Sequence, residues 1–248
     1  MRTIRKVSLV LLACATLLPT QAAVGREKVE EVLARFLNAA GGKAAIEKVK
    51  SRVMKGTADG MGMPAPLPWE LHSAAPNKQL SKVEIPGLGT VLDGFDGQVA
   101  WSKNPITGLR IKEGDELAKA KRDATLARDV QFLSLYPDLT YKGTEKLDDE
   151  EVLVLESKPT PTSTERFSFS NKSGLLVRQE SRFETAQGSV KNEVRLSDHR
   201  AVDGVQYPYL LRVKAEAAGQ PAMEFTIKIT ELRANVLIDH ALFAKPAN

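Results

Sequence analysis

Cysteine is nearly absent from this chain of 248 residues, which contains only Cys14. A single thiol forms no disulfide within the chain and supplies no thiolate metal site. Histidine is also scarce: His72, His199 and His240 are the only three, and no two have the i, i+4 spacing of a metal pair on one helix face. These scarcities exclude disulfide frameworks and cysteine–histidine metal sites, so no cofactor and no metal is expected.

Motifs of the common catalytic folds are absent as well. The sequence lacks the G-x-S-x-G nucleophile turn, the phosphate-cradling G-x-x-x-x-G-K and the dinucleotide-binding G-x-G-x-x-G. Asp198 and His199 are adjacent, but neighbouring strand residues point to opposite faces of a sheet, so we interpret them as part of a hairpin with His199 at the surface or at a strand end. The acidic stretch 147–152 is interpreted as a charged hairpin tip. No catalytic residue and no enzymatic activity is predicted.

The charge of the chain gives no sign of a nucleic-acid partner. The net charge is +4, and without Arg2, Arg5 and Lys6 the remaining chain holds 32 basic against 31 acidic residues, a net charge of +1. Basic and acidic residues alternate along the chain and form no basic stripe with interleaved aromatic residues. We therefore expect mixed-charge, solvated surfaces and no nucleic-acid binding.

Residues 1–22 have the pattern of a secretory signal peptide. Three basic residues precede the apolar run 7–18, and Thr20-Gln21-Ala22 is a small-x-small cleavage site. The run is shorter than the roughly 20 residues that span a bilayer, and no later run is long enough. The sequence therefore predicts a periplasmic mature chain, residues 23–248, without a transmembrane segment. Lipidation at Cys14 is the alternative, which the bulky Leu12 two positions before it disfavours.

Helical periodicity is confined to three segments. Residues 26–42 carry one apolar stripe, formed by Val29, Val32, Leu33, Phe36 and Leu37, and end at Gly41-Gly42. A short helix is predicted at residues 43–50. The third segment, residues 115–132, is amphipathic with Asp115 as its predicted amino cap, so it is expected to cover an apolar surface.

From Ser51 onward the period of the apolar residues is two, which predicts strands. The clearest example is the stretch 223–232, in which apolar and polar residues alternate strictly. The dipeptides Asp59-Gly60, Asp93-Gly94, Asp96-Gly97 and Asp203-Gly204 predict tight turns between sequential strands. The fold class is thus mainly β: a single large curved antiparallel sheet, with helices covering its concave side. The stretches predicted as strands are 52–58, 68–73, 79–85, 97–103, 151–157, 165–170, 175–183, 189–197, 206–214 and 223–232.

Two stretches carry a resemblance to a known family: "FDGQVAW" at residues 95–101 and "VDGVQYP" at residues 202–208. Together with the order of the other segments, they resemble the outer-membrane lipoprotein-sorting proteins of the bacterial envelope, similar to the periplasmic carrier LolA and its receptor LolB. This resemblance covers nearly the whole mature chain. It implies an incomplete β-barrel of about eleven strands whose hollow accepts acyl chains, and a non-enzymatic role with a lipid or an acylated protein as partner. A monomer is expected, and an envelope protein is a possible further partner.

Large apolar residues on the predicted strands are the candidate ligand-binding wall, although core packing is the ordinary role of each. The apolar hairpin loop between the first two predicted strands is the candidate lid, because flexible methionine side chains suit an adaptable cover. The sequence leaves open which strand arginine, if any, faces the hollow: Arg178, Arg182, Arg195 or Arg212. The wall candidates are Trp69, Leu71, Phe95, Trp101, Phe167, Phe169, Phe225 and Ile227, and the lid candidates are Met61, Met63 and Leu67.

Two other functions remain open from the residues alone. An envelope protein-interaction or sensing module would have the same sheet with a hollow filled by its own side chains. A hydrolase would use a carboxylate pair, which only distances in the fold can define.

Overall fold

A computed structural model describes residues 21–247 of the chain. The predicted signal sequence up to Thr20, including Cys14, lies outside this range. The described chain begins in helix α1, Gln21–Ala39, followed by the short helix α2, Lys43–Lys48. Both agree with the helices predicted from the apolar stripe and from the Gly41-Gly42 stop.

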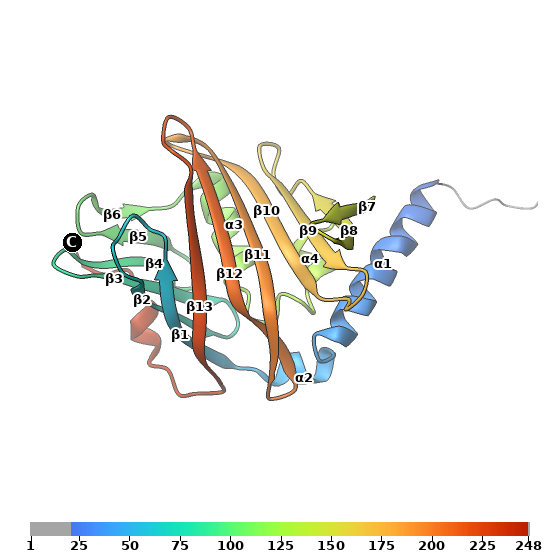
Figure 1. The fold of residues 1–248 in the computed structure, drawn as a ribbon, viewed down its shortest axis with the longest axis horizontal. Helices are drawn as coiled ribbons and strands as arrows, with labels where there is room; N and C mark the ends of the chain where they lie inside the picture. Colours follow the sequence, from blue (N-terminus) through green and yellow to red (C-terminus); the bar gives the residue numbers. More distant parts are fainter. Residues whose placement is uncertain (1–20, 248) are drawn as a thin grey trace, which may run out of the picture.

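Thirteen antiparallel strands form one sheet that does not close into a barrel. Its order is β6-β5-β4-β3-β2-β1-β13-β12-β11-β10-β9-β8-β7, which is two sequential meanders joined where β1 pairs with β13 (Figure 1). The strands are β1 Ser51–Asp59, β2 Leu67–Ala74, β3 Lys78–Ile85, β4 Gly89–Phe95, β5 Ala100–Asn104, β6 Gly108–Ile111, β7 Thr140–Leu147, β8 Glu150–Ser157, β9 Thr164–Ser170, β10 Leu176–Thr185, β11 Gly188–Val202, β12 Val205–Ala217 and β13 Met223–Ala234.

The sheet has thirteen strands, not about eleven, and three of them fall outside the predicted stretches: β4, β6 and β7. The reason is clearest at β4, where Asp93-Gly94 had the sequence of a turn but lies inside the strand. A Cβ on Gly94 would lie 2.4 Å from the indole ring of Trp101, so this glycine leaves room for a neighbouring side chain instead of turning the chain. Asp203-Gly204, by contrast, is the tight turn between β11 and β12.

The two edge strands, β6 and β7, are consecutive in the chain but lie at opposite ends of the sheet order. Their connection, residues 112–139, must therefore cross the sheet from one edge to the other. It contains helices α3, Gly114–Asp123, and α4, Phe132–Leu135, which lie behind strands β10–β12 in Figure 1. This crossing segment covers the concave face.

The crossing segment is not the continuous helix predicted for residues 115–132, because α3 ends at Asp123 and turns precede α4. Asp115 is also not the amino cap, which is Glu113. The Asp115 carboxylate is buried and accepts hydrogen bonds from the hydroxyl groups of Thr160 and Thr162 and from the backbone N–H of Glu184. It ties the start of α3 to the loop before β9 and to β10.

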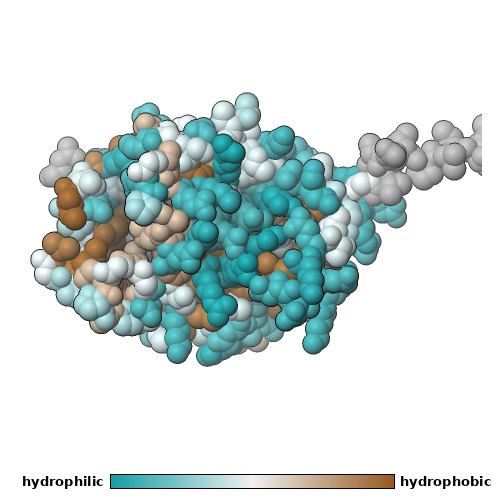
Figure 2. All heavy atoms as spheres, turned by 45° about the horizontal axis from the view of Figure 1, so that its top comes forward, coloured by the Kyte–Doolittle hydropathy of each residue, from teal (hydrophilic) through white to brown (hydrophobic). Residues whose placement is uncertain are grey.

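The main core lies between α1, α4 and the concave side of the sheet. At the β7–β9 end it is aromatic: Phe132 packs edge-on against Phe167, with ring centroids 4.8 Å apart, and Phe36 lies 5.1 Å from Phe169. The face of the molecule drawn in Figure 2 differs from one end to the other. Figure 2 shows hydrophilic residues across its middle and apolar residues gathered at the end formed by β3–β6.

Candidate ligand-binding cavity

A cavity of about 560 Å³ lies between the middle of the sheet and the crossing segment. This volume is within the range of about 300–1,000 Å³ typical of small-molecule sites. Gln79 on β3 and Asn192 on β11 both line it, although β2, β1, β13 and β12 separate these strands in the sheet. The sheet therefore curls far enough for strands on its two halves to line one shared cavity.

The floor of the cavity is the concave face of β1, β2 and β11–β13, and it is mostly apolar. Apolar residues reach it from alternate positions of each strand, as the period of two requires. The apolar residues of the floor are Met54, Trp69, Leu71, Val194, Leu196, Leu211, Val213, Ala215, Phe225 and Ile229, and the polar ones on the same strands are Arg52, Asn192, His199, Gln206 and Tyr207.

The roof of the cavity is charged, because the crossing segment turns polar side chains toward the floor. Lys119, Asp123, Arg128 and Asp129 line it, together with Thr125 and Leu126. The Asp123 carboxylate lies 2.6 Å from Lys119 Nζ and 3.4 Å from the Arg128 guanidinium. Burial by itself would raise the pKa of Asp123, but these two cations hold it below its ordinary value. Asp123 is thus an ionised carboxylate with both neighbours positive.

Asp129 is the second roof carboxylate, and its surroundings differ from those of Asp123. It is half-buried and forms no ion pair within residues 21–247. Burial raises its pKa above the ordinary value, and the positive charges of Arg128 and Arg52 oppose this shift only in part.

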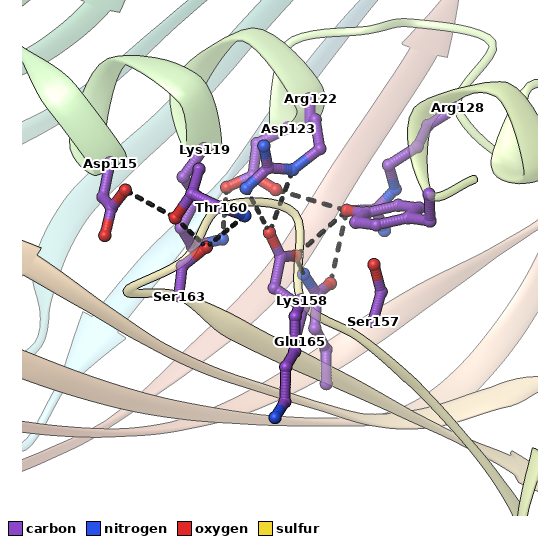
Figure 3. Close-up of polar contacts among 12 residues, drawn as sticks. Asp115, Lys119, Arg122, Asp123, Arg128, Ser157, Lys158, Thr160, Ser163 and Glu165 are labelled. Atoms are coloured by element: carbon purple, nitrogen blue, oxygen red, sulfur yellow. Dashed lines mark hydrogen bonds and ion pairs between the residues drawn. The ribbon is translucent and has the colours of Figure 1, made fainter. Parts of the chain in front are cut away.

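A buried ion pair fixes the crossing segment to the sheet. Figure 3 shows Arg122 reaching from α3 to Glu165 on β9. The Glu165 carboxylate is 1% exposed and accepts hydrogen bonds from Arg122 at 2.6 and 3.0 Å and from the Tyr136 hydroxyl at 3.0 Å. Burial and the charge of Glu165 raise the pKa of Tyr136, so its hydroxyl stays protonated and donates. This network holds the roof in place above the floor.

The predicted wall residues divide among several places. Trp69, Leu71 and Phe225 line the cavity, and Ile227 is buried beside it in the main core. Phe167 and Phe169 also face the concave side, but they pack into the aromatic cluster at the β7–β9 end and do not reach the cavity.

Phe95 and Trp101 lie outside the cavity and on different faces of the sheet. Phe95 packs beneath α3 and lines a smaller hollow of about 200 Å³ beside that helix. Trp101 packs with Leu80 against Phe243 of the C-terminal 3₁₀ helix, His240–Phe243, and its indole N–H donates to the Phe243 carbonyl at 3.2 Å. No local pattern in the sequence predicts that this segment covers the outer side of β3 and β5.

The three predicted lid residues also lie outside the cavity lining. Met61 is half-buried against the main core, Met63 is half-buried, and Leu67 begins β2 and is 3% exposed.

Arg52 and His199 are two of the polar cavity residues that were not predicted from the sequence. Neither Arg178, Arg182, Arg195 nor Arg212 lines it, whereas Arg52 on β1 does. His199 also lines it, instead of lying at the surface, while Asp198 turns outward to pair with Arg200. Burial lowers the pKa of His199, so its ring is neutral at neutral pH. Side chains of a strand alternate between the two faces of the sheet, so Arg52 lies on the same face as the apolar Met54. This alternation is the sequence pattern from which its place in the cavity could have been predicted.

This arrangement suits binding better than bond cleavage. The general base of a hydrolase needs a free carboxylate lone pair aimed at its substrate. Asp123 is engaged by Lys119 and Arg128, and Glu165 accepts four hydrogen bonds. Asp129 is the one carboxylate of the cavity lining without an ion pair within residues 21–247, so this lining does not offer the two free carboxylates that a hydrolase pair needs. An apolar floor beneath a charged roof matches the two ends of an amphiphile.

Comparison by sequence finds no relative: no protein-family model matches the chain, and no curated protein is significantly similar to it. Solved structures do match. A putative outer membrane lipoprotein-sorting protein domain from Vibrio parahaemolyticus has a TM-score of 0.55 at 13% identity, and the match covers 91% of this chain and 98% of that one.

Two further structures match over similar lengths. A DUF1329 family protein from Desulfovibrio piger has a TM-score of 0.54 at 16% identity, covering 87% of this chain and 97% of that one. A LolA superfamily protein from Nitrosomonas europaea has a TM-score of 0.53 at 13% identity, with the same two coverages. At these identities the likeness establishes a common fold alone. It confirms the LolA-like fold that the resemblance implies.

None of the helices within residues 21–247 is both long enough and apolar enough to cross a membrane.

Proposed function

We propose that this protein is a non-enzymatic carrier or binding protein for a lipid, a lipoprotein acyl chain or a similar amphiphile, held between the curved sheet and the crossing segment. The observation that carries the proposal is the cavity of about 560 Å³ with its apolar floor. Each methylene group moved from water onto that floor contributes about 0.8 kcal/mol, so affinity requires no reacting group. Residues 1–22 fit this role as a signal peptide that directs residues 23–248 to the periplasm.

The likeness to a lipoprotein-sorting domain supports this choice among the roles that an open curved sheet allows. A cavity with a polar side and an apolar side would orient an amphiphile without covalent chemistry. A partner in the envelope that loads or receives the cargo would be an acylated protein or a lipid-bearing membrane.

The first test is extraction of the purified mature protein followed by mass spectrometry, and rebinding of alkyl maltosides of ten, twelve and fourteen carbons by the delipidated protein. We expect co-purifying lipid and an affinity that rises about fifteenfold for each two carbons added, until the cavity is full. Absence of both lipid and rebinding would overturn the proposal and favour the protein-interaction module, which crosslinking to an envelope partner would then identify.

A cavity-filling variant shows whether the alkyl chain of the ligand binds on the cavity floor. Val194 lies on β11 in the floor of the cavity. Val194→Trp therefore places a large ring in the cavity and should abolish rebinding. Lys191→Trp is the matched control, since Lys191 is an exposed residue of the same strand. Equal rebinding by the two variants would place the ligand elsewhere.

A further inference from the structure

Arg52 is a cavity arginine that contacts Tyr207 but has no carboxylate partner among residues 21–247. It lines the cavity from β1, its Nε is buried, and this nitrogen has no hydrogen-bond acceptor. Its guanidinium lies 5.3 Å from the ring centroid of Tyr207 and forms no ion pair with any carboxylate of residues 21–247. A buried charged donor left unsatisfied is costly, so such a group calls for an explanation.

The other arginines that lie mainly under the surface are paired. Arg122 has Glu165, and Arg178 has Glu145 at 3.0 Å and Glu180 at 3.3 Å. Arg52 differs from these because no carboxylate oxygen of residues 21–247 lies within 4.0 Å of its guanidinium nitrogens. The missing acceptor is therefore one that a ligand can supply.

A second, weakly held cation faces the same space from the roof. One nitrogen of Arg128 donates to Asp123 Oδ1 at 3.4 Å and to Gln179 Oε1 at 3.3 Å, both longer than the usual 2.9 Å or so of an N–H···O bond. Asp123 already has a closer partner in Lys119. Arg128 is thus free to exchange these long contacts for an incoming anion.

The charges that line the cavity leave a positive excess. The cations are Lys119 on α3, Arg128 on the α3–α4 connection and Arg52 on β1, and the anions are Asp123 and Asp129. The net charge is +1 with Asp129 ionised and +2 with it protonated, and burial favours the protonated form. His199 on β11 and Tyr207 on β12, the remaining titratable groups of the lining, are neutral at neutral pH because burial lowers the pKa of His199 and raises that of Tyr207.

We propose that Arg52 and Arg128 form an anion-binding subsite that holds the negatively charged head group of the ligand while its alkyl chain lies on the apolar floor. This rests on the proposed function and narrows it to amphiphiles with a phosphate, sulfonate, sulfate or carboxylate head. Guanidinium groups suit such heads because their planar donors match two oxygens at once. The enclosure of the site by the roof strengthens the attraction, since exposed charges would be screened by salt.

The test compares three ligands with the same twelve-carbon chain, each below its micellar concentration: dodecanesulfonate, dodecylphosphocholine and dodecyl maltoside. The sulfonate is expected to bind at least about tenfold more tightly than the neutral maltoside, as a charge-assisted hydrogen bond provides. Inorganic sulfate serves as the head group without a chain. If it binds alone with the affinity of the sulfonate, the site takes a free anion, and the proposed subsite for an amphiphile is overturned.

The decisive variant is Arg52→Gln, with Arg233→Gln, an exposed arginine of the neighbouring strand β13, as the matched control. Arg52→Gln should weaken sulfonate binding at least about tenfold relative to maltoside binding and so remove the preference, whereas Arg233→Gln should leave the preference in place. Arg52→Lys, which keeps the charge, should restore part of the preference. If Arg52→Gln does not fold, Arg128→Gln replaces it with the same expectation.

The outcomes separate the two proposals. Equal binding of all three ligands, or equal loss of all three in Arg52→Gln, overturns the subsite and leaves the carrier function in place. Failure of every ligand to bind the unmodified protein overturns the carrier function and the subsite with it.

Discussion

Two regions of the concave face have the same alternation of apolar residues along their strands, but one is closely packed and the other borders a cavity. At the β7–β9 end, Phe167 and Phe169 meet Phe36 of α1 and Phe132 of α4, and the space is filled by aromatic rings. In the middle, the floor of β1, β2 and β11–β13 faces the charged roof across a cavity of about 560 Å³. The difference does not come from the strands, because both regions place apolar residues at every second position.

What differs is the segment that covers each region. Helix α4 and the amphipathic face of α1 present large apolar side chains, which fill the space beneath them. The segment between α3 and α4 also packs Leu126, Ala127 and Val130 against the core, but it lines the cavity with Arg128 and Asp129, whose charges pack poorly against an apolar floor. The chemistry of the cover therefore decides whether the same sheet forms a core or a binding cavity.

The same substitution in the two regions tests this comparison most strongly. Phe132→Ala removes a ring that is 2% exposed from a closely packed cluster, and it should lower the free energy of unfolding by about 3–5 kcal/mol. Phe225→Ala removes a half-buried ring that borders the cavity, and it should cost under about 1.5 kcal/mol because less packing is lost there. Urea unfolding followed by circular dichroism measures both. Equal losses would mean that the cavity is packed as tightly as the aromatic end.

The sequence predicts the sheet and its helices, because alternation and helical stripes are local patterns. It predicts that apolar strand faces are buried, and Trp69, Leu71, Phe167 and Phe169 are all on the concave side. It does not predict which of them border empty space, since that depends on the path of residues 112–139 across the sheet.

Arg52 illustrates the same limit. Within its strand it is one polar residue on an otherwise apolar face, and nothing in the local sequence separates it from the exposed Arg182 of β10 and Arg212 of β12. Only the curl of the sheet and the crossing roof enclose it. The prediction that Trp101 lines the cavity is wrong for a similar reason. The C-terminal 3₁₀ helix that covers Trp101 is far away in the sequence, so no local pattern predicts the contact.

Buried carboxylates extend the comparison to charge, beginning with Glu165. Glu165→Gln leaves Arg122, which is 8% exposed, without its counter-ion, and it should lower the free energy of unfolding by about 3 kcal/mol. The melting temperature at neutral pH measures this loss. Glu193→Gln is the control, since Glu193 pairs with Arg195 in a more exposed position and should cost under about 1 kcal/mol. A loss for Glu165→Gln no larger than the control would show that the roof is not held by this pair.

Neutralising Asp129 should raise the free energy of unfolding instead of lowering it, and by the smallest amount of these substitutions. Because burial raises its pKa in the folded protein, ionisation of Asp129 opposes folding, and the stability that its protonated form provides is lost as pH rises through the folded-state pKa. Asp129→Asn removes this loss and should raise the free energy of unfolding at pH 7 by less than about 1 kcal/mol. Below the ordinary aspartate pKa of about 3.9, the variant and the unmodified protein should be equally stable, since both are then neutral at this position. Urea unfolding at pH 3.5, 5 and 7 gives the profile. A variant that is less stable at pH 7 would show that Arg52 and Arg128 stabilise the Asp129 carboxylate more than burial penalises it, and the roof would then resemble the paired, closed end of the molecule.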